Sequence, residues 1–290
     1  MRKTVNSLSG GKSSSYIAAN YPADYNVFAL VRTTDKNCIY PDKKLRQVVS
    51  DKIGTEFIGT LEQDNIIKIM LDLEQYIGRE IIWITGETFD DVINGEWNKG
   101  KNGSNYLPNL MVRYCTTHLK MIPIFEWWKK EIKEVVEMRI GFRANETKRA
   151  SKMISKLNSN GIEEMKTIIG SRGTRNKWGM VEWRVPSFPL IDDIVYKDKI
   201  ENYWQKNKEV RFEKGYYNNC VGCFHRNPIF LNKMNQEHPN KMGWFAKQEE
   251  INYPNKFKSE ISYKEIIKHK KQIEIQWDDF SECDSGFCGL

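Results

Sequence analysis

The fold is decided by one stretch near the start of the chain, Leu8-Ser9-Gly10-Gly11-Lys12-Ser13-Ser14-Ser15. An apolar run at 3–8 predicts a buried strand before it, and residues 14–20 predict the start of a helix after it. Adjacent glycines permit positive φ and a close approach of the backbone to a ligand. Successive backbone N–H groups at a helix N-terminus favour an anion. The stretch therefore predicts a phosphate-binding loop, the alternative being a turn that only caps the helix.

Short apolar runs alternate with helical patterns around this loop. Apolar runs predict strands at 27–31, 57–58, 80–84 and 135–140, and an extended segment at 185–190. Helical spacing predicts helices at 41–51, 66–77, 116–133, 145–156 and 197–206. Strands that alternate with helices are typical of a mostly parallel sheet covered on both faces. We expect a doubly wound α/β domain at 1–210 and a cysteine-rich C-terminal extension at 211–290.

Composition and charge narrow the class of protein. The 290 residues include 45 Lys and Arg against 38 Asp and Glu, a net charge of +7. This charge suits an anionic substrate or a nucleic-acid partner. No run approaches the roughly 20 apolar residues of a membrane helix, and no secretory signal is evident. We expect a cytoplasmic protein that has no membrane partner, with a mobile Gly- and Asn-rich loop at 94–109.

Six cysteines are more typical of thiols, metal ligands or catalytic groups than of disulfides in a reducing compartment. The Cys220-Val221-Gly222-Cys223 turn aims two sulfurs to one side. That spacing serves a metal, a cluster or a redox dithiol. Cys115 is the first candidate for a third ligand, and Cys38 is expected to be a buried small residue.

The loop resembles the S-G-G-x-[DS]-S signature of the PP-loop ATP pyrophosphatases, a class that includes the phosphoadenosine-phosphosulfate reductases, tRNA thiolases and DNA phosphorothioation enzymes. Three further segments are similar to the reductase family in order: Arg113 to Lys120 with Pro123, Gly141 to Arg149, and Pro189 to Asp192. The resemblance implies binding of ATP or of an adenylyl sulfate-type nucleotide. Ser13 stands where many ATP-cleaving members have Asp.

The resemblance and the chemistry together predict a nucleotide site. Its expected residues are Ser9, Gly10, Gly11, Lys12, Ser13, Ser14, Ser15, Asp35, Gly141 and Arg143. Asp35 and Glu87 follow predicted strands, where either carboxylate suits Mg²⁺ bound to ATP phosphates. Arg143 and Arg149 suit phosphate or sulfate oxygens, or else they pair with Glu146.

The resemblance also implies a [4Fe–4S] cluster. Adenylyl-sulfate reductases hold one with a Cys-Cys pair and a C-x-x-C turn, and this chain has Tyr114-Cys115 at the pair. Cys115, Cys220 and Cys223 thus match three of four ligands, with zinc or no metal as alternatives. The fourth ligand is open, with the candidates Cys288, Cys283, His225 and Cys38, or none from the protein.

The C-terminal tail matches the reductases in part. Glu282-Cys283 and Cys288-Gly289-Leu290 each give half of the family's Glu-Cys-Gly-Leu segment, whose cysteine attacks the sulfate group. A thiol near arginines has a lowered pKa and is a competent nucleophile. Closure of a metal site by the tail cysteines is the alternative.

Three hypotheses for function follow. In the favoured one, a substrate oxygen attacks the α-phosphorus of ATP and a sulfur species then displaces AMP, with Lys12 and Arg143 as catalytic residues. The acceptor (tRNA, DNA, a protein or a small molecule) is open, and a sulfur-donor protein is a possible partner. The second is an adenylyl- or phosphoadenylyl-sulfate reductase with Cys283 or Cys288 as nucleophile. The third, favoured by Ser13, is a catalytically silent nucleotide-binding accessory protein.

Overall fold

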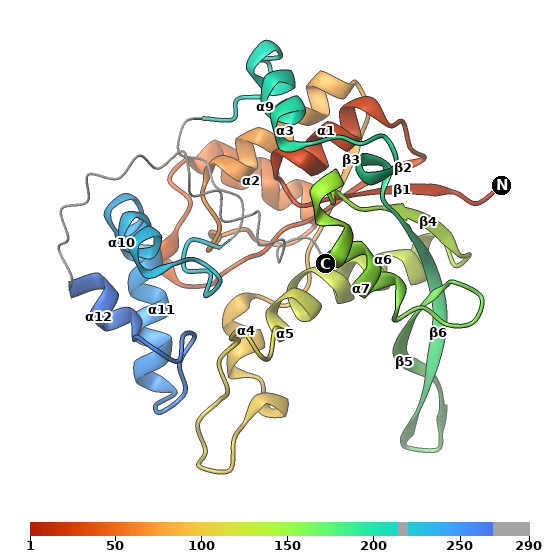
Figure 1. The fold of residues 1–290 in the computed structure, drawn as a ribbon. Coiled ribbons are helices and arrows are strands. Elements are labelled where there is room, and N and C mark those ends of the chain that lie inside the picture. The colour runs from red at the N-terminus through yellow and green to blue at the C-terminus, as the bar shows by residue number, and fades with distance from the viewer. Residues whose placement is uncertain (214–219, 269–290) are drawn as a thin grey trace.

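A six-stranded sheet forms the centre of the molecule (Figure 1). The computed structural model describes residues 1–213 and 220–268. In sheet order the strands are β3 (Ile81–Ile84), β2 (Tyr25–Ala29), β1 (Thr4–Leu8), β4 (Val136–Arg139), β6 (Arg175–Ser187) and β5 (Glu163–Arg172). All neighbours are parallel except β5, which pairs antiparallel with β6. The expected α/β class and mostly parallel sheet are confirmed.

Helices cover both faces of this sheet, and further helices lie beside it. The helices of the described residues are α1 (Lys12–Asn20), α2 (Lys43–Ile53), α3 (Asn65–Ile77), α4 (Phe89–Asn94), α5 (Tyr114–Thr116), α6 (Ile122–Glu131), α7 (Thr147–Ile154), α8 (Pro189–Asp192), α9 (Lys197–Lys206), α10 (Pro228–Glu237), α11 (Pro239–Ile251) and α12 (Tyr263–Lys268). Because successive strand residues point to opposite faces, Val5 and Val27 pack with α6, whereas Leu8 and Phe28 pack with α1, α3 and α9. This layering is consistent with a doubly wound fold.

A second apolar cluster lies beside the sheet. Residues of α10, α11 and α12 pack there against α4 and against Val31 and Leu61. Phe245 contacts Phe257 and Tyr263 within it, with ring centroids 5.2 and 5.7 Å apart. The C-terminal helices therefore share a core with loops that leave the carboxyl ends of the strands.

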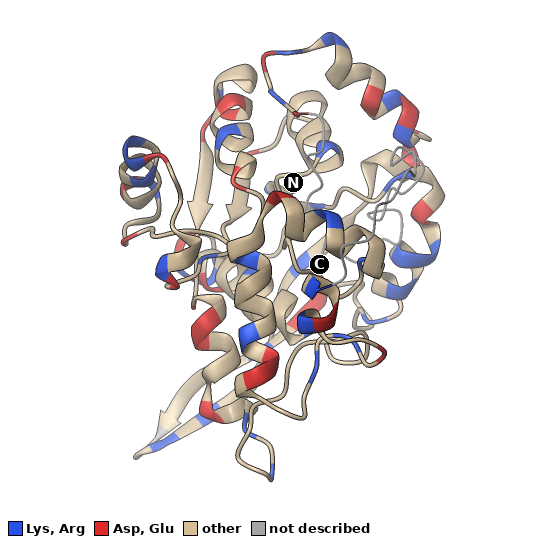
Figure 2. Cartoon of the chain, turned by 90° about the vertical axis from the view of Figure 1, so that its left-hand side faces the viewer, with Lys and Arg blue, Asp and Glu red and all other residues tan. Residues whose placement is uncertain are grey.

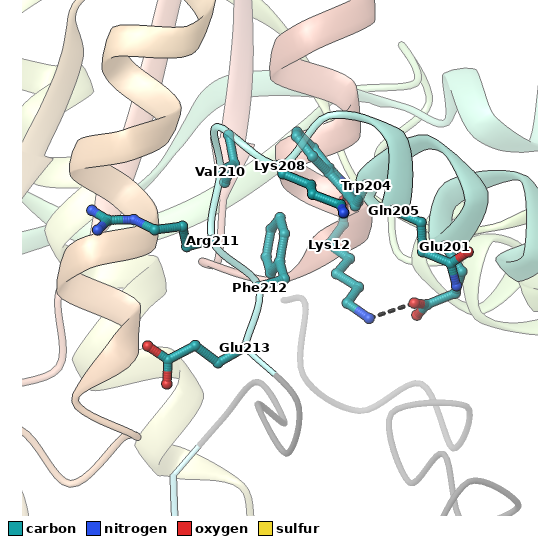
Figure 3. Close-up of a pocket in the computed structure, with 9 residues that line it drawn as sticks. All are labelled: Lys12, Glu201, Trp204, Gln205, Lys208, Val210, Arg211, Phe212 and Glu213. Atoms are coloured by element: carbon teal, nitrogen blue, oxygen red, sulfur yellow. Dashed lines mark hydrogen bonds and ion pairs between the residues drawn. The ribbon is translucent and has the colours of Figure 1, made fainter.

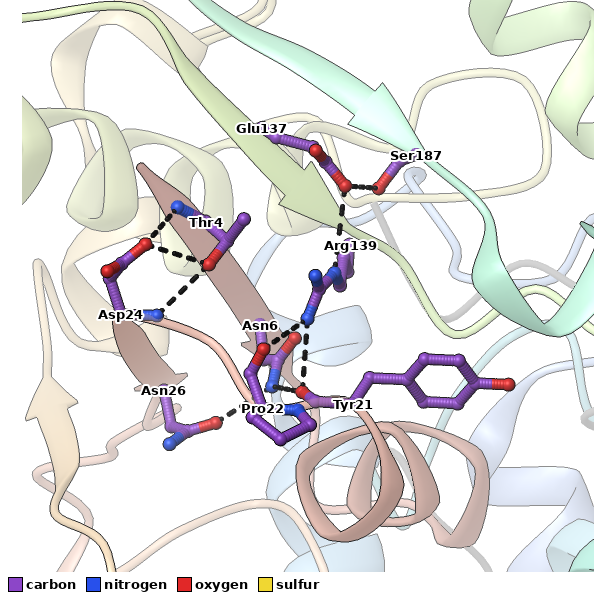
Figure 4. Close-up of polar contacts among 9 residues, drawn as sticks. All are labelled: Thr4, Asn6, Tyr21, Pro22, Asp24, Asn26, Glu137, Arg139 and Ser187. Atoms are coloured by element: carbon purple, nitrogen blue, oxygen red, sulfur yellow. Dashed lines mark hydrogen bonds and ion pairs between the residues drawn. The ribbon is translucent and has the colours of Figure 1, made fainter. Parts of the chain in front are cut away.

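Buried polar contacts fix the far end of α1 (Figure 4). Asn6, buried in β1, donates to the carbonyl of Tyr21 at 2.9 Å and to Oδ1 of Asn26 at 3.0 Å. Arg139 of β4 donates to the carbonyls of Tyr21 and Pro22 at 3.1 and 2.7 Å. The end of the helix is thus tied to β1 and β4, which positions its N-terminus.

Three segments differ from expectation. The strand expected at 57–58 is wrong: Gly59 forms only isolated bridges with Thr33 and Ile39. Of the extended segment expected at 185–190, residues 185–187 form the end of the much longer β6, whose partner β5 was not expected, and residues 189–190 begin α8. The loop at 94–109 is anchored, since Asn105 exchanges hydrogen bonds with Asn252 and Asn255 at 3.0 and 2.9 Å.

Across the described ranges 1–213 and 220–268, each helix is too short or too polar to cross a membrane.

Candidate functional site

The glycine loop connects β1 to α1 at the carboxyl edge of the sheet. The chain passes from β1 to β2 on one side, and β4 later lies on the other side of β1. The loop therefore lies where the strand order reverses, the usual ligand position in such sheets. Gly10 has a φ of 77°, and Gly11 is the N-cap of α1 without a side-chain cap. A glycine is required at position 10 because other residues are strained at this φ.

The serines of the loop have separate roles. The Ser14 hydroxyl accepts from the Ser9 N–H at 3.2 Å and donates to the Gly11 carbonyl at 3.0 Å, so it holds the loop in its curve. Ser15 is fully buried, and its hydroxyl has no hydrogen-bond partner within the part of the chain that the structure describes. A buried polar group of this kind is costly unless it is satisfied, for instance by a bound ligand.

Gly141, just after β4, packs directly against the loop. A Cβ added there would lie 3.2 Å from the Ser14 nitrogen and 3.4 Å from its Cα. The sequence placed both segments in the nucleotide site, and the structure brings them together. Glycine at 141 is explained by this approach of two backbones.

The two arginines that follow are engaged with an acid. Arg143 is buried, and its Nε donates to Oε2 of Glu146 at 3.1 Å. Arg149 donates to Oε1 of the same carboxylate at 2.6 Å and lies 4.0 Å from the Phe142 ring. This is the pairing that the sequence offered as the alternative to phosphate binding. A phosphate bound by either arginine has to share it with Glu146.

Lys12 points from the loop into a pocket beside α9 (Figure 3). Its ammonium forms an ion pair with Glu201, and its carbonyl accepts from Trp204 Nε1 at 2.9 Å. The pocket has a volume of about 580 Å³. Its lining residues are Lys12, Glu201, Trp204, Gln205, Lys208, Val210, Arg211, Phe212 and Glu213. The sequence did not anticipate Glu201 as the partner of Lys12.

The two carboxylates expected to bind Mg²⁺ lie at the carboxyl edge but have other partners. Asp35 caps a short helical turn, accepting from the Asn37 N–H at 2.8 Å. Glu87 lies 3.5 Å from Nδ1 of His118, whose ring stacks on Trp97 at 4.3 Å. Among the described residues, no group of three His, Cys, Asp or Glu side chains is arranged to hold one ion.

Three cysteines gather beyond the ends of β2 and β3. Cys115 lies in α5, before a π-helical turn at Thr117–Met121, and Cys220 forms a backbone bridge with Glu62. Burial, and then the Cys223 thiol, raise the pKa of Cys115 to about 11. Burial raises the pKa of Cys220 well above its usual value, with added effects of Glu62 and Cys223. The thiols are close enough to influence one another, and their joint ligation of a metal or cluster stays a prediction.

The turn between Cys220 and Cys223 is closely packed. A Cβ on Gly222 would lie 2.3 Å from the Phe245 ring, so only glycine fits. The Gly222 carbonyl accepts from the Tyr263 hydroxyl at 2.9 Å. The second apolar cluster therefore fixes the backbone of the turn that carries both thiols.

A buried ion pair lies beside the thiols and was missed in the sequence. Lys120 donates to Oε1 of Glu62 at 3.0 Å, and Lys241 donates to the Glu62 carbonyl at 2.5 Å. Oε2 of Glu62 is buried and has no hydrogen-bond partner among residues 1–213 and 220–268. No local signal marks Glu62, since a Glu in a polar loop is usually solvated.

The remaining cysteines divide into two groups. Cys38 is buried as expected, and burial raises its pKa to about 12. The predicted nucleophiles Cys283 and Cys288, one of them also the predicted fourth metal ligand, lie outside the described residues. His225 is half-buried, and burial lowers its pKa to about 4, which keeps the ring neutral.

Comparison of the chain with family models, with curated proteins and with solved structures found no match.

Proposed function

We propose that this protein is a PP-loop adenine-nucleotide enzyme, similar to the phosphoadenosine-phosphosulfate reductase family, that couples activation by the α-phosphate of ATP to sulfur transfer. The observation that carries the proposal is that two chemical features lie together at the carboxyl edge of the sheet. There the Gly10–Gly11 loop lies at the reversal of strand order, and the thiols of Cys115, Cys220 and Cys223 gather beyond the neighbouring strands. A phosphate cradle and a sulfur site at one edge suit one coupled reaction.

In the first step an acceptor oxygen attacks the α-phosphorus, the bond to the β-phosphate oxygen breaks, and pyrophosphate leaves. The loop N–H groups and the N-terminus of α1 stabilise the departing charge. The unsatisfied Ser15 hydroxyl is an additional donor for a phosphate oxygen. In the second step a sulfur nucleophile forms a bond to the activated carbon, the carbon–oxygen bond breaks, and AMP leaves.

The donor set of the sulfur site is three cysteine thiols. Soft thiolates suit both an iron–sulfur cluster and zinc, so zinc stays the alternative. When bound by Cys115, Cys220 and Cys223, an iron–sulfur cluster would supply an iron site for an exogenous sulfide.

A specific observation favours a different candidate, the catalytically silent nucleotide-binding accessory protein. Each predicted phosphate-binding cation already has an acidic partner: Lys12 pairs with Glu201, and both Arg143 and Arg149 pair with Glu146. Together with Ser13, this pairing suits a site that binds a nucleotide without cleaving it.

The test is pyrophosphate release and sulfur incorporation under anaerobic conditions, with ATP, Mg²⁺, radiolabelled sulfide and mixed nucleic acids. The enzyme should release pyrophosphate and label the acceptor, and Cys220→Ser should lose labelling while it retains nucleotide binding. Binding of ATP without pyrophosphate release would favour the accessory protein. Sulfite formation from an adenylyl sulfate, lost in Cys283→Ser or Cys288→Ser, would favour the reductase instead.

A further inference from the structure

The β5–β6 hairpin extends beyond the rest of the sheet. β6 pairs with β4 only from Arg184 to Ser187, so its first part and most of β5 bond only to each other. The hairpin extends towards the bottom of Figure 1, away from α1 and α10. A two-stranded ribbon that pairs with no third strand buries little surface area and is therefore only marginally stable.

One face of this hairpin carries exposed apolar side chains. Directly paired residues share a face, and the pairs Ile168–Trp178 and Lys166–Met180 are adjacent. Trp178 and Met180 are each 56% exposed, and Ile168 is 39% exposed. The Lys166 ammonium lies 5.9 Å from the Trp178 ring centroid. Neighbouring exposed apolar side chains of this kind are typical of a binding surface.

The charge on the hairpin is positive. Lys166, Arg175 and Lys177 are exposed, and no acid lies between Glu164 and Glu182 in the sequence. Glu182 lies at the base of the hairpin, where its Oε1 accepts a hydrogen bond from Nδ2 of Asn158 at 2.6 Å. Lys129, from the last turn of α6, adds a further cation and donates to Thr167 at 3.2 Å. Figure 2 shows Lys and Arg along the strands that reach the bottom of that view.

We propose that this hairpin binds single-stranded nucleic acid, with Trp178 stacked on a base and Lys166, on the same face, on a phosphate. Arg175 and Lys177 lie on the opposite face of the two-stranded ribbon and contact phosphates where the nucleic acid passes round its edge. Stacking on an aromatic ring accepts any base, and cations beside it follow the backbone. The same cations disfavour a second copy of this chain, because like charges would face each other. The binding itself is independent of the glycine loop. Only the identification of the nucleic acid as the acceptor rests on the proposed function.

The test is fluorescence anisotropy with a labelled 12-nucleotide single strand, as RNA and as DNA, from 50 to about 200 mM salt. The chain should bind, and affinity should fall with salt. Trp178→Ala should weaken binding about tenfold without changing the salt dependence. Arg175→Gln with Lys177→Gln should weaken binding and reduce the slope of log affinity against log salt by roughly 1.4, since each phosphate contact contributes about 0.7.

Matched controls are Tyr253→Ala, which removes an even more exposed aromatic residue outside the hairpin, and Lys264→Gln. Both should bind as the wild type does. Hairpin variants that bind normally would overturn the proposal. So would a dimer in light scattering that dissociates in Trp178→Ala while oligonucleotide binding is unchanged. Gly10→Val should still bind the oligonucleotide. A loss of ATP binding in this variant can therefore be distinguished from a loss of nucleic-acid binding.

Discussion

The Nζ of Lys120 lies 3.0 Å from Oε1 of Glu62, where the carboxylate side chain is 1% exposed and the lysine side chain 15%. The backbone of Glu62 bridges to Cys220, so the pair borders the thiol site. The glutamate raises the pKa of the Cys220 thiol, and the lysine opposes it. This ion pair therefore balances the charge next to the sulfur site.

Removal of the lysine alone should be strongly destabilising. Lys120→Met leaves the Glu62 charge buried without this partner, which costs about 3 kcal/mol or more. Lys120→Met combined with Glu62→Gln should recover most of that loss, because no buried charge remains. Urea unfolding measures both. In the exposed pair, Lys264→Met should cost less than about 1 kcal/mol. Equal losses in the two lysine variants would contradict the account.

The ion pair between Lys12 and Glu201 should compete with bound phosphate. Both side chains are 31% exposed, so the pair is worth about 1 kcal/mol at most. Glu201→Gln should then raise ATP affinity up to about fivefold, because Lys12 no longer has to leave the Glu201 carboxylate before it binds a phosphate. Lys12→Met should lower the affinity and abolish the effect of Glu201→Gln in the double variant. An additive double variant would show that Glu201 does not act on ATP binding through Lys12.

The packing of Gly222 against Phe245 should make the cysteine turn sensitive to one methyl group. Gly222→Ala should cost about 1–3 kcal/mol in unfolding free energy, because the Phe245 ring has to move. It should also lower the iron bound per chain after anaerobic purification. Gly243→Ala, in α11 where nothing lies within 4 Å, should instead stabilise by up to about 1 kcal/mol. A neutral Gly222→Ala would mean that the turn is not fixed by this contact.

His238 should make stability depend on pH. Burial, then Lys241, lower its pKa from 6.5 to about 4. Between these values the unfolded chain binds a proton that the folded chain does not, so the stabilising contribution is present above pH 6.5 and is lost as pH falls to 4. After allowance for partial exposure, the wild type should lose about 1–2 kcal/mol more than His238→Gln between pH 7 and 4.5. Parallel pH profiles in urea unfolding would exclude this.

The sequence predicted the central strands because burial on both faces gives continuous apolar runs, as in Val27 to Val31. The β5–β6 hairpin was missed because its outer half is solvent-exposed and carries no such run. Alternation at Val181, Trp183 and Val185, after a turn at Gly173 with a φ of 60°, was the available signal.

Some residues of the candidate site could also be predicted from the sequence, and others could not. The Gly10–Gly11 loop is a local backbone feature, so the sequence alone locates it. Glu62 and Glu201 are defined by partners 58 and 189 residues away, Lys120 and Lys12, and short-range patterns carry no information on such contacts.

The most direct test of the central claim is calorimetric titration of the wild type and Gly10→Val with ATP and Mg²⁺. The wild type should bind ATP, and the variant should bind at least about tenfold more weakly, because valine is strained at a φ of 77° and distorts the cradle. Gly243→Ala should bind as the wild type does. Absence of heat from the wild type, or equal affinity in a folded Gly10→Val, would contradict nucleotide binding at this loop.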